Sequence, residues 1–432
     1  MNIIPYPDRA DWSALLARPV QSTQQIETVV APIMAQVRAG GDTALIELTN
    51  KFDKVDLAAH GLEVSADELD AAEAQLSDEL KDAIRQAYQN IRVFHEAQKQ
   101  PVQKIETMPG VTCWRKSVGI ERVGLYVPGG SAPLLSTVLM LGVPAQLAGC
   151  REVVLCTPGH HPAIFFAARL VGVTRVFRIG GAQAVAAMTY GTESVPQVDK
   201  IFGPGNQYVT AAKMLVAKEG MAIDMPAGPS EVAIYADDTA VPSFVAADLL
   251  SQAEHGADSQ VLLVSTSKKL VNSVNLTIGT QLDRLPRREV ATKALANSKA
   301  ILVETQQDAI DLLNQYAAEH LILSVADAET VADKIINAGS IFLGNYTPES
   351  AGDYASGTNH TLPTNGFARA YSGVSLDSFV KKITVQHITP EGLRALGPVV
   401  EVMAEAESLD AHKRAVSLRL ASLRDTVPFI SA

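Results

Sequence analysis

The sequence predicts an α/β fold built on mostly parallel sheet, because short apolar runs alternate with helical segments from residue 123 onward. Strands that alternate with helices of about 10–15 residues form βαβ units, whose crossovers place helices on both faces of a sheet. Proline and glycine interrupt the alternation around residues 226–230, so we expect two α/β halves. The predicted strands are Gly124–Pro128, Val153–Cys156, Arg175–Ile179, Lys200–Phe202, Glu231–Ala236, Gln260–Ser265, Ala300–Thr305, Leu321–Val325 and Ser340–Gly344.

The segment before the first sheet is predicted to be an arm followed by helices. Residues 1–22 are polar and interrupted by proline, whereas residues 23–100 carry helical patterns. Ser65 and Glu68 have the spacing of a capping box at a helix start. A later helix has one apolar face, and His95 follows the end of that face as a core or rim histidine. The face consists of Leu80, Ile84, Ala87, Tyr88, Ile91 and Phe94.

The last segment is predicted to be helical from about residue 376 to residue 432. Thr389, Pro390 and Glu391 have the order of an N-cap, a first-turn proline and a first-turn acid. A tail of this length with short helices makes a marginal core on its own. We therefore expect it to dock on another surface.

Composition excludes several classes of function. The 432 residues carry a net charge of −11, which argues against nucleic-acid and anionic-membrane partners, because these need a concentrated basic face. Three cysteines are too few for a disulfide framework or a cysteine-rich zinc site, and they are typical of a reducing compartment. The N-terminus lacks the apolar core of a signal peptide, and glycine and proline break the uncharged stretch 123–150. We expect a cytoplasmic protein without a membrane span.

Glycine-rich turns follow three of the predicted strands, at Pro128–Ser131, Gly180–Gln183 and Gly203–Asn206. The dinucleotide fingerprint GxGxxG is absent. Ligands of parallel sheets bind where strands end and helices begin, so these turns are candidates for one nucleotide crevice. Ordinary tight turns between strand and helix are the alternative. In the first case Tyr126, Gln183 and Asn206 would face the ligand.

Two acid–base groupings stand at predicted helix ends. Gln252 and His255 are three residues apart and would share one helical face near Gly256. Glu319 and His320 are adjacent just before a predicted strand, and a carboxylate beside an imidazole is a candidate proton-transfer pair. His60 and His387 have no polar partner nearby in the sequence and are interpreted as surface residues.

A long polar loop is predicted after residue 348, with Asp353 and His360 seven residues apart. Structureless loops of this length are usually functional in compact domains. Zinc accepts imidazole and carboxylate ligands scattered along a chain, although no HExxH motif is present. The residues that such a site would use are Gln252, His255, Asp353 and His412; capped helix ends and a satisfied polar loop are the alternative.

Several long segments closely resemble the histidinol dehydrogenase family over nearly the whole chain. They are GLYVPGGSAPLLSTVLML, IGGAQAVAAMTYGTESVPQVDKIFGPGN, IDMPAGPSEV, DLLSQAEHG, EHLIL, PESAGDYASGTNHTLPT and AESLDAHKRAVSLR. The resemblance implies a zinc- and NAD-dependent homodimer that oxidises histidinol to histidine in two steps. It also implies two incomplete Rossmann-like domains. The expected domains are an arm (1–22), a discontinuous zinc and catalytic domain (23–122 and 231–375), an NAD-binding domain (123–230) and a helical dimerisation tail (376–432).

Carried over residue by residue, the resemblance implies roles for twelve positions. One zinc ion per subunit would be held by Gln252, His255, Asp353 and His412. Glu319 and His320 would be acid–base catalysts, and NAD would contact Tyr126, Gln183 and Asn206. Substrate would contact the four zinc ligands together with Ser230, His320, His360 and Glu407, with Glu407 and His412 donated across the dimer.

These roles are chemically consistent with two successive oxidations. His320, expected to be neutral near pH 7, would take the alcohol proton, and Glu319 would activate the water that hydrates the aldehyde. A covalent role for Cys150 or Cys156 is a weaker alternative, because both flank a buried strand without an activating partner. The remaining alternatives are a relative that oxidises another small polar alcohol, such as a sulfonated diol, and a non-catalytic metal-stabilised binding protein.

Overall fold

The computed structural model describes residues 1–18, 23–53, 57, 61–129 and 133–425. All nine predicted strands are present, and they fall into two parallel sheets that separate at residues 226–230, so the predicted α/β fold is confirmed. The larger sheet has the order β1-β11-β10-β9-β12-β13. Its strands are β1 (Asn2–Pro5), β9 (Glu231–Ala236), β10 (Gln260–Ser265), β11 (Lys299–Leu302), β12 (His320–Ser324) and β13 (Ser340–Leu343).

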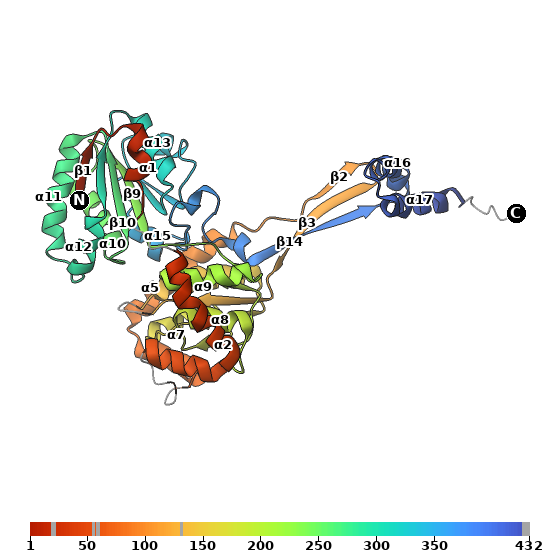
Figure 1. The fold of residues 1–432 in the computed structure, drawn as a ribbon, viewed down its shortest axis with the longest axis horizontal. Coiled ribbons are helices and arrows are strands. Elements are labelled where there is room, and N and C mark those ends of the chain that lie inside the picture. Colours follow the sequence, from red (N-terminus) through yellow and green to blue (C-terminus); the bar gives the residue numbers. More distant parts are fainter. Residues whose placement is uncertain (19–22, 54–56, 58–60, 130–132, 426–432) are drawn as a thin grey trace. The chain divides into compact units, whose positions relative to one another are not determined.

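Alternate residues of the larger sheet enter two different cores, since successive side chains of a strand point to opposite faces. Val232 and Ile234 of β9 pack with one group of helices, whereas Ala233 and Tyr235 pack with the other group and with Trp12. Figure 1 shows the two groups on either side of the strands. The first group is α10 (Pro242–Ala253), α11 (Lys268–Leu282) and α12 (Arg288–Ala296); the second is α1 (Trp12–Leu15), α13 (Gln306–Tyr316) and α14 (Ala328–Ala332).

The smaller parallel sheet is also covered on both faces and has the order β6-β5-β4-β7-β8. Val153 and Leu155 pack toward α5, α6 and α7, whereas Val154 and Cys156 pack toward α2, α8 and α9. Its strands are β4 (Arg122–Tyr126), β5 (Glu152–Cys156), β6 (Arg175–Phe177), β7 (Lys200–Phe202) and β8 (Ala222–Ile223). Its helices are α2 (Thr23–Phe52), α4 (Ala66–Ala72), α5 (Asp78–Glu96), α6 (Leu135–Ala148), α7 (Pro162–Leu170), α8 (Gly181–Tyr190) and α9 (Gln207–Lys218).

The N-terminal segments are distributed differently from the expected domains. Residues 2–5 of the predicted arm form edge strand β1, paired in parallel with β11. Helices α2 and α5 were grouped with residues 231–375, yet they pack on the smaller sheet, through Val30, Val37 and Ile91 among others. An amphipathic stripe shows which face of a helix is buried, but it does not show which sheet buries that face. The sequence pattern therefore does not determine which sheet α2 and α5 pack on.

Most side chains of α4 and α5 lie as the sequence predicts. Ser65 and Glu68 form the predicted capping box. The apolar face of α5 buries Ile84, Ala87 and Ile91, and His95 is fully buried at its end, as predicted. Phe94 was assigned to this face wrongly, since it is 47% exposed. His60 and residues 130 and 131 of the first glycine turn lie outside the described residues.

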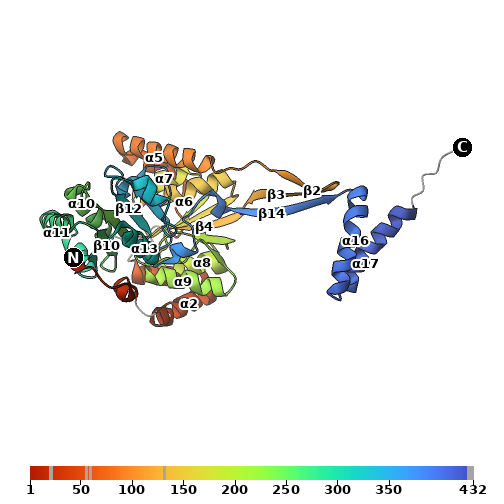
Figure 2. The same ribbon diagram turned by 90° about the horizontal axis from the view of Figure 1, so that it is seen from above.

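A second compact unit comprises Lys99–Val118 and Val380–Ala432. The predicted helical tail is confirmed for α16 (Pro390–Ala406) and α17 (Asp410–Asp425), which pack together as a helical hairpin (Figure 2). Thr389 caps α16 as predicted, and His387 is exposed. The tail also contains a strand, β14 (Val380–Ile388), which the sequence patterns do not predict, because its partner β3 (Val111–Gly119) lies far away in the sequence. β3 pairs on its other side with β2 (Lys104–Met108). Within the described residues, no helix is both long and apolar enough to cross a membrane.

Candidate active site

Glu319 and His320 lie at the start of β12, immediately after the left-handed turn at Ala317 that ends α13. Both side chains are buried, with exposed fractions of 9% and 4%. The turn brings the chain from the helix layer back into the sheet, so that both side chains reach the site from one short segment. Glu319 Oε2 and His320 Nδ1 are 3.6 Å apart.

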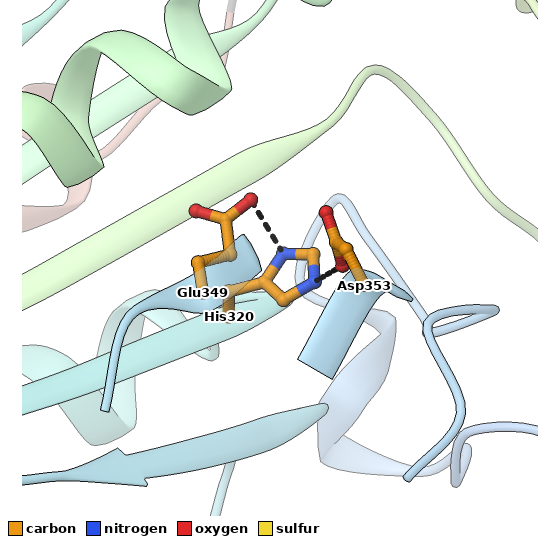
Figure 3. Close-up of side chains that lie close together, drawn as sticks. All are labelled: His320, Glu349 and Asp353. Carbon is orange, nitrogen blue, oxygen red and sulfur yellow. Dashed lines mark ion pairs between the residues drawn. The ribbon is translucent and has the colours of Figure 1, made fainter. Parts of the chain in front are cut away.

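Two further carboxylates flank the His320 ring, and both come from α15 (Glu349–Tyr354). Asp353 Oδ1 lies 3.4 Å from His320 Nε2, and Glu349 Oε1 lies 4.0 Å from Nδ1 (Figure 3). Glu349 and Asp353 are four residues apart, which places both on one side of the short helix. The prediction of a structureless loop after residue 348 is therefore wrong at its start, where this helix forms.

Backbone contacts orient the imidazole ring. His320 Nδ1 lies 3.2 Å from the carbonyl oxygen of Glu231 on the neighbouring strand β9. A carbonyl only accepts hydrogen bonds, so Nδ1 carries the hydrogen of a neutral ring. His320 Nε2 is buried and makes no hydrogen bond. The nitrogen that faces Asp353 is therefore the one free to exchange a proton.

The carboxylates around His320 oppose the neutral ring that the sequence leads us to expect. Burial lowers the pKa of an imidazole, but here the surrounding carboxylates outweigh it and raise the pKa of His320 well above its usual value. The contributing carboxylates are Glu319, Glu349 and Asp353. Burial alone would raise the pKa of Asp353, but the His320 ring, with smaller contributions from His360 and His255, holds it below its usual value.

Only part of the predicted zinc set lies together. The ligand atoms of His320, Glu349 and Asp353 are all within 4.8 Å of one another, and Asp353 is the one member that was predicted as a ligand. Gln252 is fully buried next to this group. In the amide orientation that gives both its nitrogen and its oxygen a hydrogen-bonding partner, the nitrogen donates to Glu349 Oε1 and the oxygen accepts the Glu231 N–H at 2.9 Å. His255 lies beyond the end of α10 and is exposed, so it does not share a helical face with Gln252. It still contributes to the lowered pKa of Asp353.

The donor atoms of this group fit a divalent cation. Besides His320 Nε2, Glu349 Oε2 is buried without a hydrogen-bonding partner. Burial raises the pKa of Glu349 well above its usual value; His320 opposes this, and the nearby carboxylates of Asp353 and Glu319 add to it. A cation beside these oxygens would relieve both the repulsion and the missing contacts. Imidazole and carboxylate are the usual nitrogen and oxygen ligands of zinc, whereas the amide oxygen of Gln252 would be an unusual one.

Two predicted substrate residues border the group. His360 Nδ1 lies 2.8 Å from the Asp353 carbonyl oxygen, and its Nε2 lies 3.1 Å from the Thr137 hydroxyl on α6. Burial lowers the pKa of His360. Ser230 directly precedes β9, and its carbonyl accepts the N–H of Gln260. Both residues therefore stand next to segments that hold His320.

The predicted cofactor residues stand where the smaller sheet meets its helices. The Tyr126 hydroxyl at the end of β4 accepts the N–H of Gly181 at 3.2 Å, and burial raises the pKa of this tyrosine. Gln183 Nε2 donates to Asp53 Oδ2 at 3.1 Å. Tyr126 and Gln183 thus meet at the N-terminus of α8, which is a favourable place for a nucleotide. Burial raises the pKa of Asp53, a carboxylate that the sequence did not single out.

Asn206 caps a helix, and its side chain is exposed. Its side-chain oxygen accepts the N–H groups of Tyr208 and Val209 and so caps α9. Gly203, at the start of the same turn, has a φ of +131°, and a Cβ there would lie 2.1 Å from the Tyr126 carbonyl oxygen. The turn therefore needs glycine to approach β4 closely.

Neither Cys150 nor Cys156, which flank and end β5 of the smaller sheet, has the environment of a nucleophile. Burial raises the pKa of Cys150 to about 11 and also raises that of the fully buried Cys156. Thiols in such surroundings are protonated near neutral pH, and the thiolate is the reactive form. The structure therefore argues against the covalent alternative.

Glu407 and His412 belong to the second compact unit. Glu407 ends α16, His412 lies in the first turn of α17, and both side chains are exposed in the single chain. Among the described residues, the sequence patterns missed Glu349, Glu231 and Arg18 as neighbours of Glu319 and His320. The i, i+4 spacing of Glu349 and Asp353 after Pro348 was the available signal for the first of these.

Comparison with known proteins identifies the family. The family model for histidinol dehydrogenase matches residues 16–420. The chain belongs to the histidinol dehydrogenase family. A histidinol dehydrogenase from Bacteroides thetaiotaomicron is 59% identical over 429 residues, which cover 98% of this chain and 100% of the relative. The one from Vibrio cholerae is 54% identical over 419 residues, covering 96% and 97%.

A solved structure gives the same result for the fold. The crystal structure of histidinol dehydrogenase from Elizabethkingia anophelis has a TM-score of 0.95 and 53% sequence identity, and it covers 98% of this chain and 99% of that one. Members of the histidinol dehydrogenase family are oxidoreductases of histidine biosynthesis. The chain is therefore an enzyme, and the alternative of a non-catalytic binding protein is wrong.

Proposed function

We propose that the chain catalyses the zinc-dependent, NAD-linked four-electron oxidation of L-histidinol to L-histidine through histidinal. The observation that carries the proposal is the buried His320 ring, whose Nε2 has no hydrogen-bonding partner and faces Asp353 beside the Glu319 carboxylate. A base, a second proton-transfer group and cation-binding oxygens thus share one site. Relatives named histidinol dehydrogenase, with more than half of their residues identical, support this substrate.

The zinc ligands that we propose are Gln252, His255, Asp353 and His412. When bound, zinc would act as a Lewis acid that orients the imidazole and amine donors of the substrate. Glu349 and Asp353 lie on either side of the His320 ring (Figure 3), and the Glu349 carboxylate would add negative charge close to a bound cation. Ser230, His360 and Glu407 would complete the contacts to the substrate.

His320 removes a proton in each oxidation. Its Nδ1 is engaged with the Glu231 carbonyl, so Nε2 accepts the hydroxyl proton as the hydride leaves. The three carboxylates that raise the pKa of His320 favour the protonated ring, and zinc held by Asp353 would offset part of their negative charge, so that the neutral ring is available as a base. NAD supplies the hydride acceptor when bound, and we propose Tyr126, Gln183 and Asn206 as its contacts. A ring held between Asp353 and Glu349 keeps its orientation while it gains and loses this proton.

Glu319 serves the second oxidation in particular. An aldehyde has no hydroxyl proton to lose, so it can give up a hydride only after water has added to its carbonyl group. Glu319 Oε2 already accepts the Glu231 N–H at 2.8 Å, which leaves its other oxygen to take a proton from that water. The burial of both catalytic side chains limits the escape of the aldehyde between the two steps.

We also propose a cytoplasmic homodimer in which Glu407 and His412 complete the active site of the partner subunit. The exposure of both side chains in the single chain is consistent with such a donation. The second compact unit also exposes large apolar side chains that a partner could cover, namely Val399, Val402, Met403, Leu409 and Leu418.

Removal of metal is expected to abolish activity. Without zinc nothing fixes the substrate donors against His320, so NADH formation from histidinol should stop after dialysis against a chelator and return when zinc is added. Metal content and thermal unfolding, measured on the same samples, show whether the protein remains folded. Full turnover by folded protein that contains no metal would contradict the zinc dependence.

Glu319→Gln is expected to slow the oxidation of histidinal more than that of histidinol. The amide still accepts the Glu231 N–H, but it cannot take a proton from water, and losses of roughly 10²-fold or more are typical for removal of a general base. Zinc content should be unchanged. Histidinol and histidinal are assayed separately as substrates, and equal losses in the two assays would contradict this role.

A further inference from the structure

Arg18 of the N-terminal segment is largely buried and contacts Glu231, a neighbour of Glu319 and His320. Arg18 Nε lies 2.5 Å from Glu231 Oε1, and Arg18 Nη2 lies 2.9 Å from Glu231 Oε2. The two side chains are 13% and 3% exposed. This two-pronged geometry is the strong form of an arginine–carboxylate contact, and it fixes orientation as well as charge. The backbone N–H of Asn365 donates to the same carboxylate at 2.9 Å.

Glu231 contacts both catalytic residues through its backbone. Its N–H donates to Glu319 Oε2, and its carbonyl oxygen lies against His320 Nδ1. One peptide segment thus sets the direction of the Glu319 carboxylate and the tautomer of the His320 ring. Among the residues that the structure describes, no other one hydrogen-bonds to both of these side chains.

Arg18 also holds the segment that leads into the catalytic pair. Its Nη2 donates to the carbonyl oxygen of Tyr316 at 2.8 Å, three residues before Glu319, and reaches that of Ala317 at 3.5 Å. The guanidinium group lies over the Tyr316 ring, 4.2 Å from its centre. The arginine therefore contacts the strand on one side of the site and the incoming turn on the other.

We propose that Arg18 and Glu231 form a positioning clamp for Glu319 and His320. The clamp aligns β9 and the Ala317 turn, so that His320 Nε2 and the free oxygen of Glu319 point at the substrate. Neither clamp residue contacts the proposed substrate atoms, so both act through the catalytic pair. The proposal rests on the proposed function, because it assigns the clamp to the two proton-transfer groups of histidinol oxidation.

The test compares three single variants and one double variant with the wild-type zinc-loaded enzyme. Glu231→Gln keeps the shape of the side chain but removes its charge, and Arg18→Lys keeps the charge but loses the two-pronged contact. A misplacement of reacting groups by about 1 Å costs on the order of 10²-fold in rate, so we expect kcat to fall by roughly 10- to 100-fold while KM for histidinol stays nearly constant. Arg18→Met leaves the Glu231 carboxylate buried without its partner, so adding Glu231→Gln to it should recover part of the lost kcat.

Arg9→Ala is the matched control. Arg9 ties the same N-terminal segment to α13 through Asp308 and Asp311, at 2.6 and 2.8 Å, but does not contact Glu231. This variant should keep the wild-type kcat. A similar loss of kcat in Arg9→Ala would show that any loosening of the segment has this effect, and it would overturn the clamp.

Unchanged kcat in Glu231→Gln and Arg18→Lys, with an active wild type, would also overturn the clamp while leaving the proposed function intact. If Glu231→Gln does not fold, Arg18→Lys decides the question, because it keeps the buried charge paired. Absence of NADH formation by the wild type would instead refute the proposed function itself. All kcat values are referred to folded protein by thermal unfolding and zinc content.

Discussion

Replacement of His320 by alanine is expected to lower kcat for histidinol and for histidinal alike, by roughly 10²- to 10⁴-fold, the usual contribution of a positioned general base. Each hydride departure needs a proton to be removed, and Nε2 of this ring is the nitrogen that is free to take it. Initial rates of NADH formation with each substrate measure the two half-reactions separately.

His95→Ala is a matched control, because it removes another buried histidine from the chain. His95 lies on α5 with its Nδ1 against the Ile91 carbonyl oxygen, and its Nε2 has no hydrogen-bonding partner, so the ring is not hydrogen-bonded to Glu319, His320 or Asp353. The control should lose thermal stability without a comparable loss of kcat. An active His320→Ala enzyme, or a loss confined to one half-reaction, would contradict the role of His320 as the shared base.

Mixing of subunits is expected to restore activity from two inactive chains. His320→Ala and His412→Ala homodimers should both be nearly inactive. If His412 is donated across the dimer, a mixed dimer contains one site with both lesions and one site with neither. Random pairing makes about half of the dimers mixed, so co-expression should return about a quarter of the wild-type activity.

The opposite arrangement has a different outcome. If His412 serves its own chain, every site in a mixed dimer carries one lesion, and the mixture should stay as inactive as either parent. Separation of the mixed dimers by two different affinity tags allows their activity to be measured directly. A mixed dimer without activity, although it binds zinc and stays folded, would contradict the donation of His412.

The core of the fold was predictable because parallel strands are buried on both faces. Such strands appear in the sequence as short continuous apolar runs, such as Val153–Cys156 and Gln260–Ser265, and all nine were recognised. The strands that were missed are of another kind. The residues of β2, β3 and β14 are mostly exposed or half-buried, whereas β8 and β1 have only two and four residues, so none of the five shows a long apolar run.

The candidate site was predictable only where its residues are neighbours in the sequence. Glu319 and His320 are adjacent, and Asp353 lies in a recognisable motif. The contact between Glu231 and Glu319 joins residues 88 positions apart, and that between Arg18 and Glu231 spans 213 positions. Nothing in the sequence distinguishes these buried charges from surface ones, because their pairing exists only once β9 and β12 lie side by side.

The number of NADH molecules formed per histidinol is the direct measure of the proposed four-electron oxidation. Purified, zinc-loaded protein is given excess NAD and a limiting, known amount of histidinol, and the NADH absorbance is followed to its end point while histidine is quantified. We expect two NADH and one histidine for each histidinol, because His320 and Glu319 complete both oxidations in one site. An end point of one NADH with histidinal released, or no NADH at all, would contradict it.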